Sequence, residues 1–479
     1  MDIFLQVLDW INTIFIALTL LSTSVQLLYM IAAFFCKKVT FKEASTKHKV
    51  CILIPARNEQ ETITALIDNL KNQNYPKDKF DIVTIAHNCT DNTATIAKNA
   101  GSMVFECKSE ERTKGMALKL AIDNYLKDDY EFFIVLDADC RVENDYISKM
   151  NDAFDSGAHI ARSYLGNINT FDNSVSCVSA LYNIRDGRIT ARVREKLGMN
   201  VQLIGNSFFM SKQLLMDFGG FPSTGTLTED SDLMIKAMLK NYKVHYVEDA
   251  IAYTEVTNTC KELFKRNMRI GNGVNKDFWK YGYKLIGKFF TTFKITYIDI
   301  FLTLAFLPIS FISCVWFPAY YIFLILKMII TGQPVLHMTM QLDLQSFIPM
   351  AIMIVAIMIV MLSMQGIVAV YLQKDRLLKD KKWKDYMKGI ALMCPIMLVT
   401  NVAITCGILN PKQSWSSIKR TTANQKITVN EISSNDGNTS TDTTINNPEF
   451  SSTEEVVDNT EKSSINNSNY SLKENNKEK

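Results

Sequence analysis

Two hydrophobic patterns follow one another along the chain. Between residues 50 and 140, short apolar runs alternate with segments whose apolar residues recur at helical spacing, as Ile63, Leu66 and Leu70 do. The apolar runs predict strands at "VCILIPA", "FDIVTIA", "SMVFEC" and "FFIVLDAD". The segments between them predict helices over residues 59–73, 88–100 and 114–126. Strands and helices that alternate at this spacing predict an α/β fold with a parallel sheet covered on both faces.

The second pattern is a set of long apolar runs on both sides of this region. Residues 11–36 contain no charged side chain and exceed the roughly 20 residues that a helix needs to cross a bilayer. Residues 295–317, 347–371 and 389–409 form similar runs. Lys37 and Lys38 follow the first run, so the positive-inside rule puts the next segment in the cytoplasm. We therefore expect a multi-pass protein of the plasma membrane; a cleaved signal peptide is the alternative for the first run.

These patterns divide the chain into four predicted segments. We expect a transmembrane anchor in residues 1–40 and a cytoplasmic α/β domain in residues 41–290. Transmembrane and interfacial helices are expected in residues 291–412, so that the α/β domain is inserted between membrane helices. Residues 413–479 are mostly polar and cannot bury enough apolar surface to fold, so we expect a disordered tail.

Composition narrows the classes of partner. The net charge of +3 is too small to indicate nucleic-acid binding. The ten cysteines are scattered, without a Cys-x-x-Cys pair or a metal-ligand spacing. This distribution favours a reduced compartment over a disulfide framework.

Two carboxylates end a very apolar stretch of the chain, "EFFIVLDADCR". Asp137 and Asp139 follow a predicted buried strand, and ligands of parallel sheets bind at the carboxyl ends of strands. Hard oxygen ligands suit Mg²⁺ or Mn²⁺, and magnesium usually takes one or two carboxylates together with substrate phosphates. The pair therefore indicates a divalent-cation site, although acidic loop residues are also common as plain surface groups.

Further polar residues follow the other predicted strands or begin helices. "PARNEQETI" puts polar residues directly after the first strand, with Glu59 at the start of a helix, and "AHNCTDNT" puts Asp91 in the polar stretch after the second strand. Lys114 begins a predicted helix, where a cation and free N–H groups can meet a phosphate. "TEDSD" puts three acidic side chains at the head of an amphipathic helix: Glu229, Asp230 and Asp232. Such residues also cap helices, and capping is compatible with catalysis.

Taken as a series, "PARNE", "NCTDNT", "DAD", "GGF" and "TED" resemble membrane-integrated family-2 glycosyltransferases, the group that contains cellulose, hyaluronan and poly-N-acetylglucosamine synthases. The resemblance covers roughly residues 50–275. It implies a Rossmann-like domain of the GT-A type, Mg²⁺ or Mn²⁺ as cofactor, and a nucleotide-sugar donor, with a UDP-sugar first among the candidates. It also implies a saccharide or lipid-linked acceptor and inversion at the anomeric carbon, which yields a β-linkage.

The same resemblance implies roles for individual positions. Asp230 would be the general base that takes the proton from the acceptor hydroxyl, with Glu229 beside it in the catalytic motif. Asp139, together with Asp137, would hold the metal. The donor-binding positions would be Pro55, Glu59, His87, Asp91, Lys114, Asp137 and Arg269. The acceptor-binding positions would be Gly205, Asp232, Arg266 and Trp279.

Two stretches depart from the pattern of the family. His87 stands where the nucleotide loop usually carries its first aspartate, which leaves the identity of the donor open. Processive members carry Gln-x-x-Arg-Trp near the membrane, whereas this chain has Arg266, Arg269 and Ile270 there. An aliphatic side chain cannot replace a flat aromatic platform, so Trp279 is the leading candidate for stacking on an acceptor sugar.

Three functions therefore stay open. The first is a polymerase that makes an extracellular β-linked polysaccharide and passes it through its own membrane helices. The second is an enzyme that adds one or a few sugars to a lipid or lipid-linked acceptor. The third is a catalytically inactive membrane scaffold that binds nucleotide or polymer. The acidic residues argue against the scaffold, because a dead site has no reason to keep charges that it must desolvate.

Overall fold

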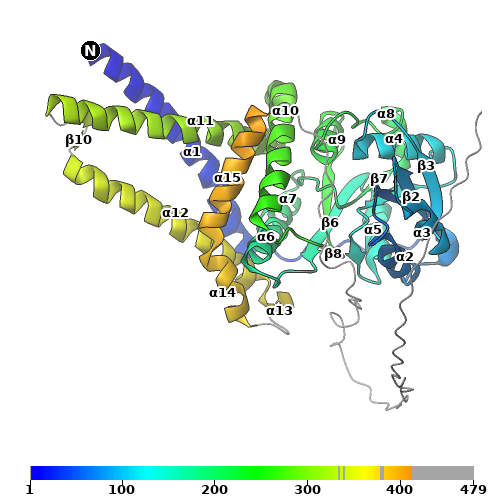
Figure 1. Cartoon of the computed structure of the whole chain (residues 1–479). Helices are drawn as coiled ribbons and strands as arrows, with labels where there is room; N and C mark the ends of the chain where they lie inside the picture. The colour runs from blue at the N-terminus through cyan, green and yellow to red at the C-terminus, as the bar shows by residue number, and fades with distance from the viewer. Residues whose placement is uncertain (1, 333–334, 338–339, 343, 378–381, 411–479) are drawn as a thin grey trace, which may run out of the picture. The chain divides into compact units, whose positions relative to one another are not determined.

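The computed structural model describes residues 2–332, 335–337, 340–342, 344–377 and 382–410 (Figure 1). The predicted polar tail, residues 413–479, lies outside these described residues. The strands are β1 (Val50–Ala56), β2 (Phe80–His87), β3 (Met103–Cys107), β4 (Phe132–Leu136), β5 (Arg141–Val142), β6 (Ile160–Asn167), β7 (Ser207–Ser211), β8 (Val244–Thr254), β9 (Val335–His337) and β10 (Met340–Leu342).

Helices precede, separate and follow these strands. Those up to the end of the sheet are α1 (Asp2–Phe35), α2 (Ile63–Lys71), α3 (Thr93–Asn99), α4 (Lys114–Tyr125), α5 (Tyr146–Asp155), α6 (Ser174–Arg185), α7 (Arg192–Lys196), α8 (Lys212–Phe218) and α9 (Glu229–Leu239). A 3₁₀ turn, η1 (Lys77–Lys79), and a π-helical segment, η2 (Asp186–Ala191), also belong to this part. The later helices are α10 (Cys260–Thr292), α11 (Ile295–Thr331), α12 (Leu344–Leu372), α13 (Lys374–Leu377), α14 (Trp383–Ala391) and α15 (Met393–Leu409).

The central sheet is mixed, with eight strands in the order β3-β2-β1-β4-β7-β6-β8-β5. The half that contains β3, β2, β1 and β4 is parallel throughout, which confirms the α/β fold predicted for residues 50–140. In the other half, β7 is antiparallel to both β4 and β6, while β6 and β8 are parallel. The short strand β5 is antiparallel to β8. The sheet is therefore fully parallel only in the half that the sequence pattern covered.

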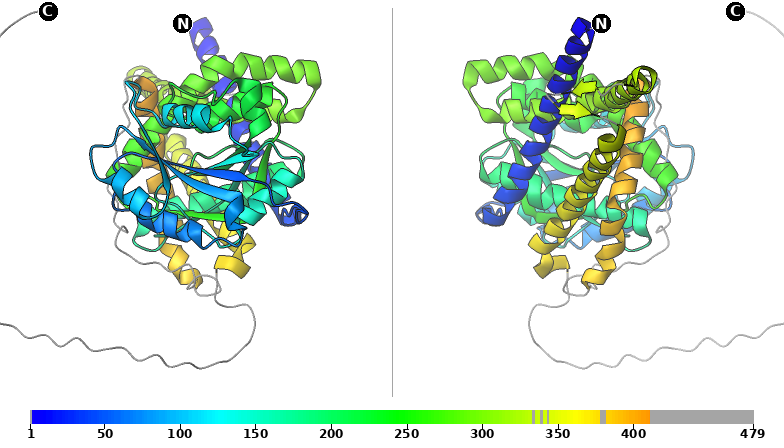
Figure 2. Two further views of the ribbon diagram at one scale, coloured as in Figure 1. Left: turned by 90° about the vertical axis from the view of Figure 1, so that its right-hand side faces the viewer. Right: turned by 90° about the vertical axis from the view of Figure 1, so that its left-hand side faces the viewer.

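Helices cover both faces of the parallel half of the sheet. Side chains of successive strand residues point to opposite faces, so alternate residues of one strand pack against different helices. Val50 and Ile52 of β1 are buried in one hydrophobic cluster with Leu66 of α2. Cys51 and Leu53 of the same strand are buried in a second cluster with residues of α4. The layers of helices on either side of the strands can be followed in Figure 2. Burial on both faces explains why β1 reads as a continuous apolar run rather than as an alternating one.

Two predicted elements are shorter in the structure than in the sequence pattern. The helix predicted over residues 59–73 begins only at Ile63, because the carbonyl of Glu59 accepts the N–H groups of Thr62 and Ile63, each at 3.1 Å, in a turn. The strand predicted over residues 132–139 ends at Leu136. The N–H of Cys140 then bonds to the carbonyl of Asp137 at 2.9 Å, which turns the chain. Both differences leave polar residues in turns at the carboxyl edge of the sheet.

The long apolar runs are helical where the structure describes them, in α1, α11, α12 and the pair α14 and α15. Within those described residues, no helix taken singly has both the length and the hydropathy expected of a membrane span. The pair α14 and α15 meets both criteria together, with a bend of 47° at the break between them. The membrane topology therefore stays a prediction.

Candidate active site

The loops that follow β1 and β2 are bonded to each other. Thr90 N donates to Asn58 Oδ1 at 2.8 Å, and Glu59 N donates to Thr93 Oγ1 at 2.9 Å. Asp91 accepts a hydrogen bond on each carboxylate oxygen, from Thr93 Oγ1 at 2.6 Å and from Gln60 N at 3.3 Å. Glu59 and Asp91, predicted as donor contacts, therefore lie in one interlocked pair of loops.

Two further predicted donor contacts lie at the same edge of the sheet. His87, the last residue of β2, is 3% exposed, and its Nε2 is 2.7 Å from Ser109 Oγ in the loop before α4. Burial lowers the pKa of His87, and the nearby Arg57 lowers it further, so the imidazole is neutral at pH 7. Pro55 is half-buried in β1 and pairs with Ile85 of β2.

Lys114 connects four segments that are distant in sequence. It is the first residue of α4, and its Nζ lies 2.5 Å from Asp137 Oδ1, 2.6 Å from the carbonyl oxygen of Gly205 and 3.5 Å from Glu229 Oε1. Burial alone would lower the pKa of Lys114, but the carboxylates of Asp137 and Glu229 raise it overall. The ammonium is therefore fully charged at neutral pH and holds Asp137 and Glu229 together.

Glu229 and Asp230 begin α9, and backbone donors fix the second of them. Asp230 Oδ2 accepts the N–H of Gly205 at 2.7 Å, and Oδ1 accepts the N–H of Ser231 at 2.8 Å. A Cβ at position 205 would lie only 3.3 Å from both Asp230 Oδ2 and Glu229 Oε1, so glycine permits this close approach. Burial raises the pKa of Asp230, and it raises the pKa of Glu229 to about 6 although Lys114 opposes it. The pair therefore titrates higher than exposed carboxylates do.

Asp137 and Asp139 lie in the turn that follows Leu136, the last residue of β4. Asp139 is 7% exposed and accepts a hydrogen bond from Thr254 Oγ1, at the end of β8, at 3.4 Å. Two carboxylates at one strand end are the hard oxygen donors that Mg²⁺ or Mn²⁺ prefers, and magnesium completes its shell with substrate phosphates. Among the described residues, no group of three or more His, Cys, Asp or Glu side chains is arranged to hold a metal ion. The donor set fits a cation that binds together with a phosphate ligand.

Asp232 faces α10 rather than the Lys114 cluster. It is 1% exposed, and its Oδ1 accepts hydrogen bonds from Tyr281 OH at 2.6 Å and from Lys280 Nζ at 2.9 Å. Lys236 Nζ lies 2.6 Å from the other carboxylate oxygen. Burial would raise the pKa of Asp232, but these donors lower it overall, beginning with Lys236. The carboxylate therefore binds α9 to α10.

The remaining predicted contacts lie on α10. Arg266 and Arg269 are half-buried, and Ile270 packs against the hydrophobic cluster that contains residues of α9 and α11. Trp279 is 70% exposed, and its ring lies 5.1 Å from that of Phe278. Ile270 thus fills a packing position, whereas Trp279 presents its ring to the surroundings.

One buried carboxyl group of the site was missed by the sequence reading. Asp277 on α10 is 2% exposed, and its Oδ2 accepts a hydrogen bond from Thr228 Oγ1 at 3.3 Å. Burial raises the pKa of Asp277 to about 7, and the charges of Asp232 and Asp230 contribute. In "GNGVNKDFWK" the aspartate stands among lysines in a helical stretch, a pattern that ordinarily predicts a solvated face.

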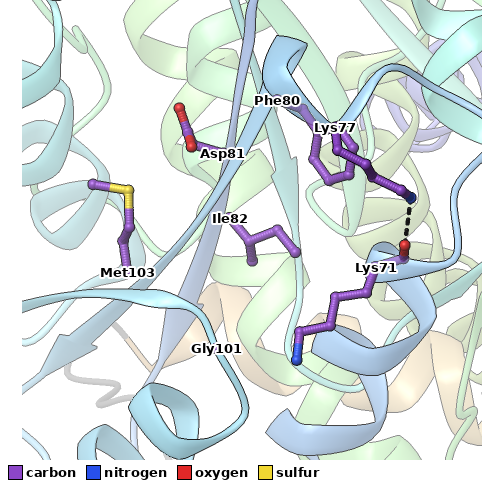
Figure 3. A pocket seen from close by; sticks show the side chains of 7 residues that line it. All are labelled: Lys71, Lys77, Phe80, Asp81, Ile82, Gly101 and Met103. Carbon is purple, nitrogen blue, oxygen red and sulfur yellow. Dashed lines mark hydrogen bonds between the residues drawn. The ribbon is translucent and has the colours of Figure 1, made fainter.

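A cavity of about 350 Å³ lies at the amino ends of the strands, opposite the carboxyl ends that carry the candidate active site (Figure 3). It is lined by Lys71, Lys77, Phe80, Asp81, Ile82, Gly101 and Met103. Phe80 begins β2 and, through the parallel strand β1, is in register with the start of β4, whereas Asp137 follows the end of β4. The cavity is therefore at the amino ends of the strands, away from the candidate active site.

Residues 132–367 match the family described as Glycosyl transferase family group 2. The chain is 25% identical over 246 residues to a beta-monoglucosyldiacylglycerol synthase of Synechocystis sp.. The aligned region covers 49% of this chain and 50% of that relative. It is also 25% identical over 250 residues to a poly-beta-1,6-N-acetyl-D-glucosamine synthase of Staphylococcus aureus, which covers 51% of this chain and 57% of that relative. The match thus spans about half the length of these curated relatives.

Two solved structures that match this chain are more distant in sequence. The mannosyltransferase PcManGT from Pyrobaculum calidifontis, in complex with GDP-Man and Mn²⁺, is 17% identical; the match covers 78% of this chain and all of that one, with a TM-score of 0.49. TarS of S. aureus in complex with UDP-GlcNAc is 15% identical; the match covers 47% of this chain and 66% of that one, with a TM-score of 0.34.

Proposed function

We propose, from the premise that residues 132–367 carry a family 2 glycosyltransferase domain, that this protein transfers a sugar from a nucleotide-sugar donor to a growing β-linked polysaccharide. The catalytic domain would be of the GT-A type, within residues 41–290, and the donor a UDP-sugar. The observation that carries the proposal is the position of Lys114 Nζ, 2.5 Å from Asp137 and 3.5 Å from Glu229. Lys114, Asp137 and Glu229 thus form a charged cluster at the carboxyl ends of the strands. Such a cluster is suited to binding a diphosphate and to an acid–base step.

On the donor side, the chain offers cations and helix-end N–H groups to a diphosphate. Lys114 stands at the first residue of α4, where its ammonium and the free N–H groups of the first turn can bind the same anion. Arg269, half-buried on α10, would add a bidentate contact. The interlocked loops with Glu59 and Asp91 would hold the nucleoside, and the neutral His87 would hydrogen-bond the base.

Asp137 and Asp139 are the residues that would hold Mg²⁺ or Mn²⁺. A divalent cation bound by them would neutralise the charge that develops on the departing diphosphate. Lys114 bonds to Asp137 and so keeps this carboxylate oriented towards the same position. The need for a metal is part of the proposal.

On the acceptor side, Asp230 is the group suited to take a proton from a sugar hydroxyl. The N–H groups of Gly205 and Ser231 fix both of its oxygens, so the carboxylate has one orientation. Burial raises its pKa, which makes the carboxylate a stronger base than an exposed aspartate would be. A single base opposite the leaving diphosphate gives inversion, and hence a β-linked product from an α-linked donor.

A second candidate is the transfer of one or a few sugars to a lipid acceptor. The packing of Ile270 favours it, because this partly buried side chain packs against the hydrophobic core and offers no flat ring to a growing polymer. The polysaccharide candidate requires another aromatic contact, and Trp279, 70% exposed on α10, is the residue proposed for it.

We further propose that the apolar helices α1, α11 and α12 anchor the protein in the plasma membrane, with the catalytic domain in the cytoplasm and the polymer passing between the helices. The support is the uncharged run of residues 11–36 followed by Lys37 and Lys38. Sealed vesicles test it: protease added on the cytoplasmic side should cut the α/β domain, and alkaline carbonate should leave the protein in the membrane.

The activity itself is tested with full-length protein in lipid nanodiscs, Mg²⁺ and a panel of radiolabelled nucleotide sugars. We expect transfer from one UDP-sugar, with a product of high mass for a polymerase or a product soluble in organic solvent for a glycolipid synthase. Asp230→Asn protein serves as the inactive control. Binding of UDP without transfer from any donor would overturn the proposal in favour of a scaffold.

A further inference from the structure

Asp277 interacts with the two residues that flank the candidate catalytic pair, Glu229 and Asp230, along the chain. It lies within α10, and its Oδ2 accepts a hydrogen bond from Thr228 Oγ1 at 3.3 Å. The side chain of Ser231 also acts on Asp277 as a hydrogen-bond donor that lowers the pKa of this carboxyl group, against the larger effect of burial. Thr228 directly precedes Glu229, and Ser231 directly follows Asp230. One carboxyl group on another helix therefore holds the residues on either side of the pair.

The contact with Asp277 takes the place of a helix cap. Thr228 is the N-cap residue of α9, where a threonine hydroxyl ordinarily accepts a backbone N–H from the first turn. In this structure the Thr228 side chain makes no such bond and donates to Asp277 instead. The hydroxyl group of Thr228 thus ties the first turn of α9 to α10.

Gly273 provides the space for this contact. It lies four residues before Asp277, on the same face of α10. A Cβ at position 273 would lie 2.3 Å from Thr228 Cγ2 and 2.4 Å from Thr228 Oγ1, closer than any side chain tolerates. Thr228 therefore packs directly against the backbone of α10 at Gly273 and donates a hydrogen bond to Asp277.

The same helix holds the next acidic residue of the motif. Lys280 Nζ and Tyr281 OH, both on α10, donate to Asp232 at 2.9 and 2.6 Å. Contacts with α10 therefore flank Asp230 on both sides along the chain. The carboxylate of Asp230 itself is bonded to backbone N–H groups, so its direction depends on where this first turn of α9 lies.

We infer that Asp277 is a positioning residue for the general base: through Thr228 and Ser231, it holds the first turn of α9 so that Asp230 faces the acceptor hydroxyl. This inference rests on the proposed glycosyl transfer, in which Asp230 is the base. Asp277 acts through other residues and does not touch the substrate. A displacement of about 1 Å at a reacting group lowers the rate about 10²-fold, so loss of this anchor is measurable.

Steady-state kinetics of the full-length protein test the inference. Asp277→Ala and Thr228→Val should each lower kcat by about 10–100-fold and leave the donor KM within about twofold, because only the base is displaced. Asp277→Asn should stay within about threefold of wild type, since its amide oxygen still accepts from a hydroxyl. The variant that carries both Asp277→Ala and Thr228→Val should be no slower than Asp277→Ala, because Asp277→Ala already removes the contact that Thr228→Val removes.

A matched control separates positioning from general loss of stability. Asp152 on α5 is also 2% exposed and accepts the N–H of Ala44 at 3.0 Å, in a helix that precedes both α9 and α10 in the chain and contains no candidate site residue. Asp152→Ala should reduce the yield of folded protein without changing kcat per folded molecule. A loss of kcat in Asp152→Ala as large as in Asp277→Ala would overturn the inference.

Hydrogen exchange provides a readout that does not depend on transfer. Backbone amides of residues 226–232 should exchange faster in Asp277→Ala and Thr228→Val than in wild type, and at the wild-type rate in Asp277→Asn and Asp152→Ala. Unchanged exchange in Asp277→Ala, or wild-type kcat in that variant, would overturn the inference. Transfer that survives Asp230→Asn would instead overturn the proposed function, so the two failures are distinguishable.

Discussion

Lys114 and Asp137 form an ion pair of 2.5 Å at the carboxyl edge of the sheet, although one residue begins α4 and the other follows β4. The same ammonium bonds to the carbonyl oxygen of Gly205 and lies 3.5 Å from Glu229. Lys114 is 19% exposed and Glu229 is 10% exposed, so removal of the cation would leave poorly solvated carboxylates without their partner. This pair is therefore the first point at which to test the site.

Lys114→Met should weaken binding of UDP by about 10- to 100-fold, since a charge-assisted contact with the diphosphate is lost. Isothermal titration in the presence of Mg²⁺ measures the effect. Lys119→Met is the matched control, because Lys119 lies on the same helix and pairs with Asp123 at the surface. Equal UDP affinity in wild type and Lys114→Met would exclude Lys114 from the donor site.

Asp230→Asn should lower the transfer rate by about 10²- to 10⁴-fold and leave UDP binding nearly intact, because it removes the base and keeps the shape of the side chain. The measurement is transfer of radiolabelled sugar beside a binding isotherm. Asp172→Asn, at an exposed position, should behave as wild type. Transfer at a near wild-type rate in Asp230→Asn would remove Asp230 from the mechanism.

Removal of divalent cations should stop turnover, because Asp137 and Asp139 supply too few ligands to retain a metal without the diphosphate. Dialysis against EDTA followed by titration with Mg²⁺ or Mn²⁺ measures the dependence. Asp139→Ala should weaken nucleotide-sugar binding only when the metal is present. Full turnover in excess EDTA would show that the two carboxylates have another role.

Trp279→Ala should shorten the product without abolishing the first transfer, if the ring of Trp279 holds a growing chain. Gel or size-exclusion analysis of the product measures its length. Tyr283→Ala is the control, since Tyr283 is 67% exposed one turn further along α10. Unchanged product length with normal membrane-inserted yield would count against processive synthesis, whereas lower yield at unchanged length would indicate a membrane-interface anchor.

The raised pKa of Asp277 should make the stability of the folded protein depend on pH. Burial, with the charges of Asp232 and Asp230, raises its pKa to about 7 from an ordinary value of 3.8. Between these pH values the folded protein binds a proton that the unfolded chain has released. The stabilisation is therefore fully present below about pH 4 and is lost as the pH rises through 7.

Asp277→Asn removes this titration. We expect its apparent Tm to exceed that of wild type by about 2–8 °C at pH 8 and the difference to close towards pH 5. Both proteins keep the other titratable and charged groups around this position: Asp230, Asp232, Lys236, Lys280 and Tyr281. A difference in Tm that is the same at every pH would contradict the assigned pKa. Scanning fluorimetry from pH 5 to 8 provides the measurement.

Local patterns predicted much of the arrangement at the carboxyl ends of the parallel strands. The run "VCILIPA" coincides with β1 because burial on both faces requires an unbroken apolar sequence. The polar residues that follow each strand then fall at one edge, since parallel strands end together. Glu59, Asp91 and Asp137 are predictable in this way, because each lies in the short polar stretch that follows its own strand in the sequence.

The contacts around Asp230 and Asp277 could not be predicted in this way, because they join segments that are distant along the chain. The N–H of Gly205 reaches Asp230 across 25 residues, and Thr228 reaches Asp277 across 49. Nothing in the residues next to Asp277 distinguishes a buried acceptor from one more charge on a lysine-rich helix.

The sequence by itself determined the α/β class, the strands of the parallel half and the positions of the strand-end acids, because hydrophobic periodicity records which residues are buried. Only the tertiary structure decided that β7 runs antiparallel beside β4, that Asp232 faces α10 and that Asp277 holds Thr228. The physical reason is that periodicity states how much of a side chain is buried, whereas the partner of a buried polar group depends on how helices pack against one another.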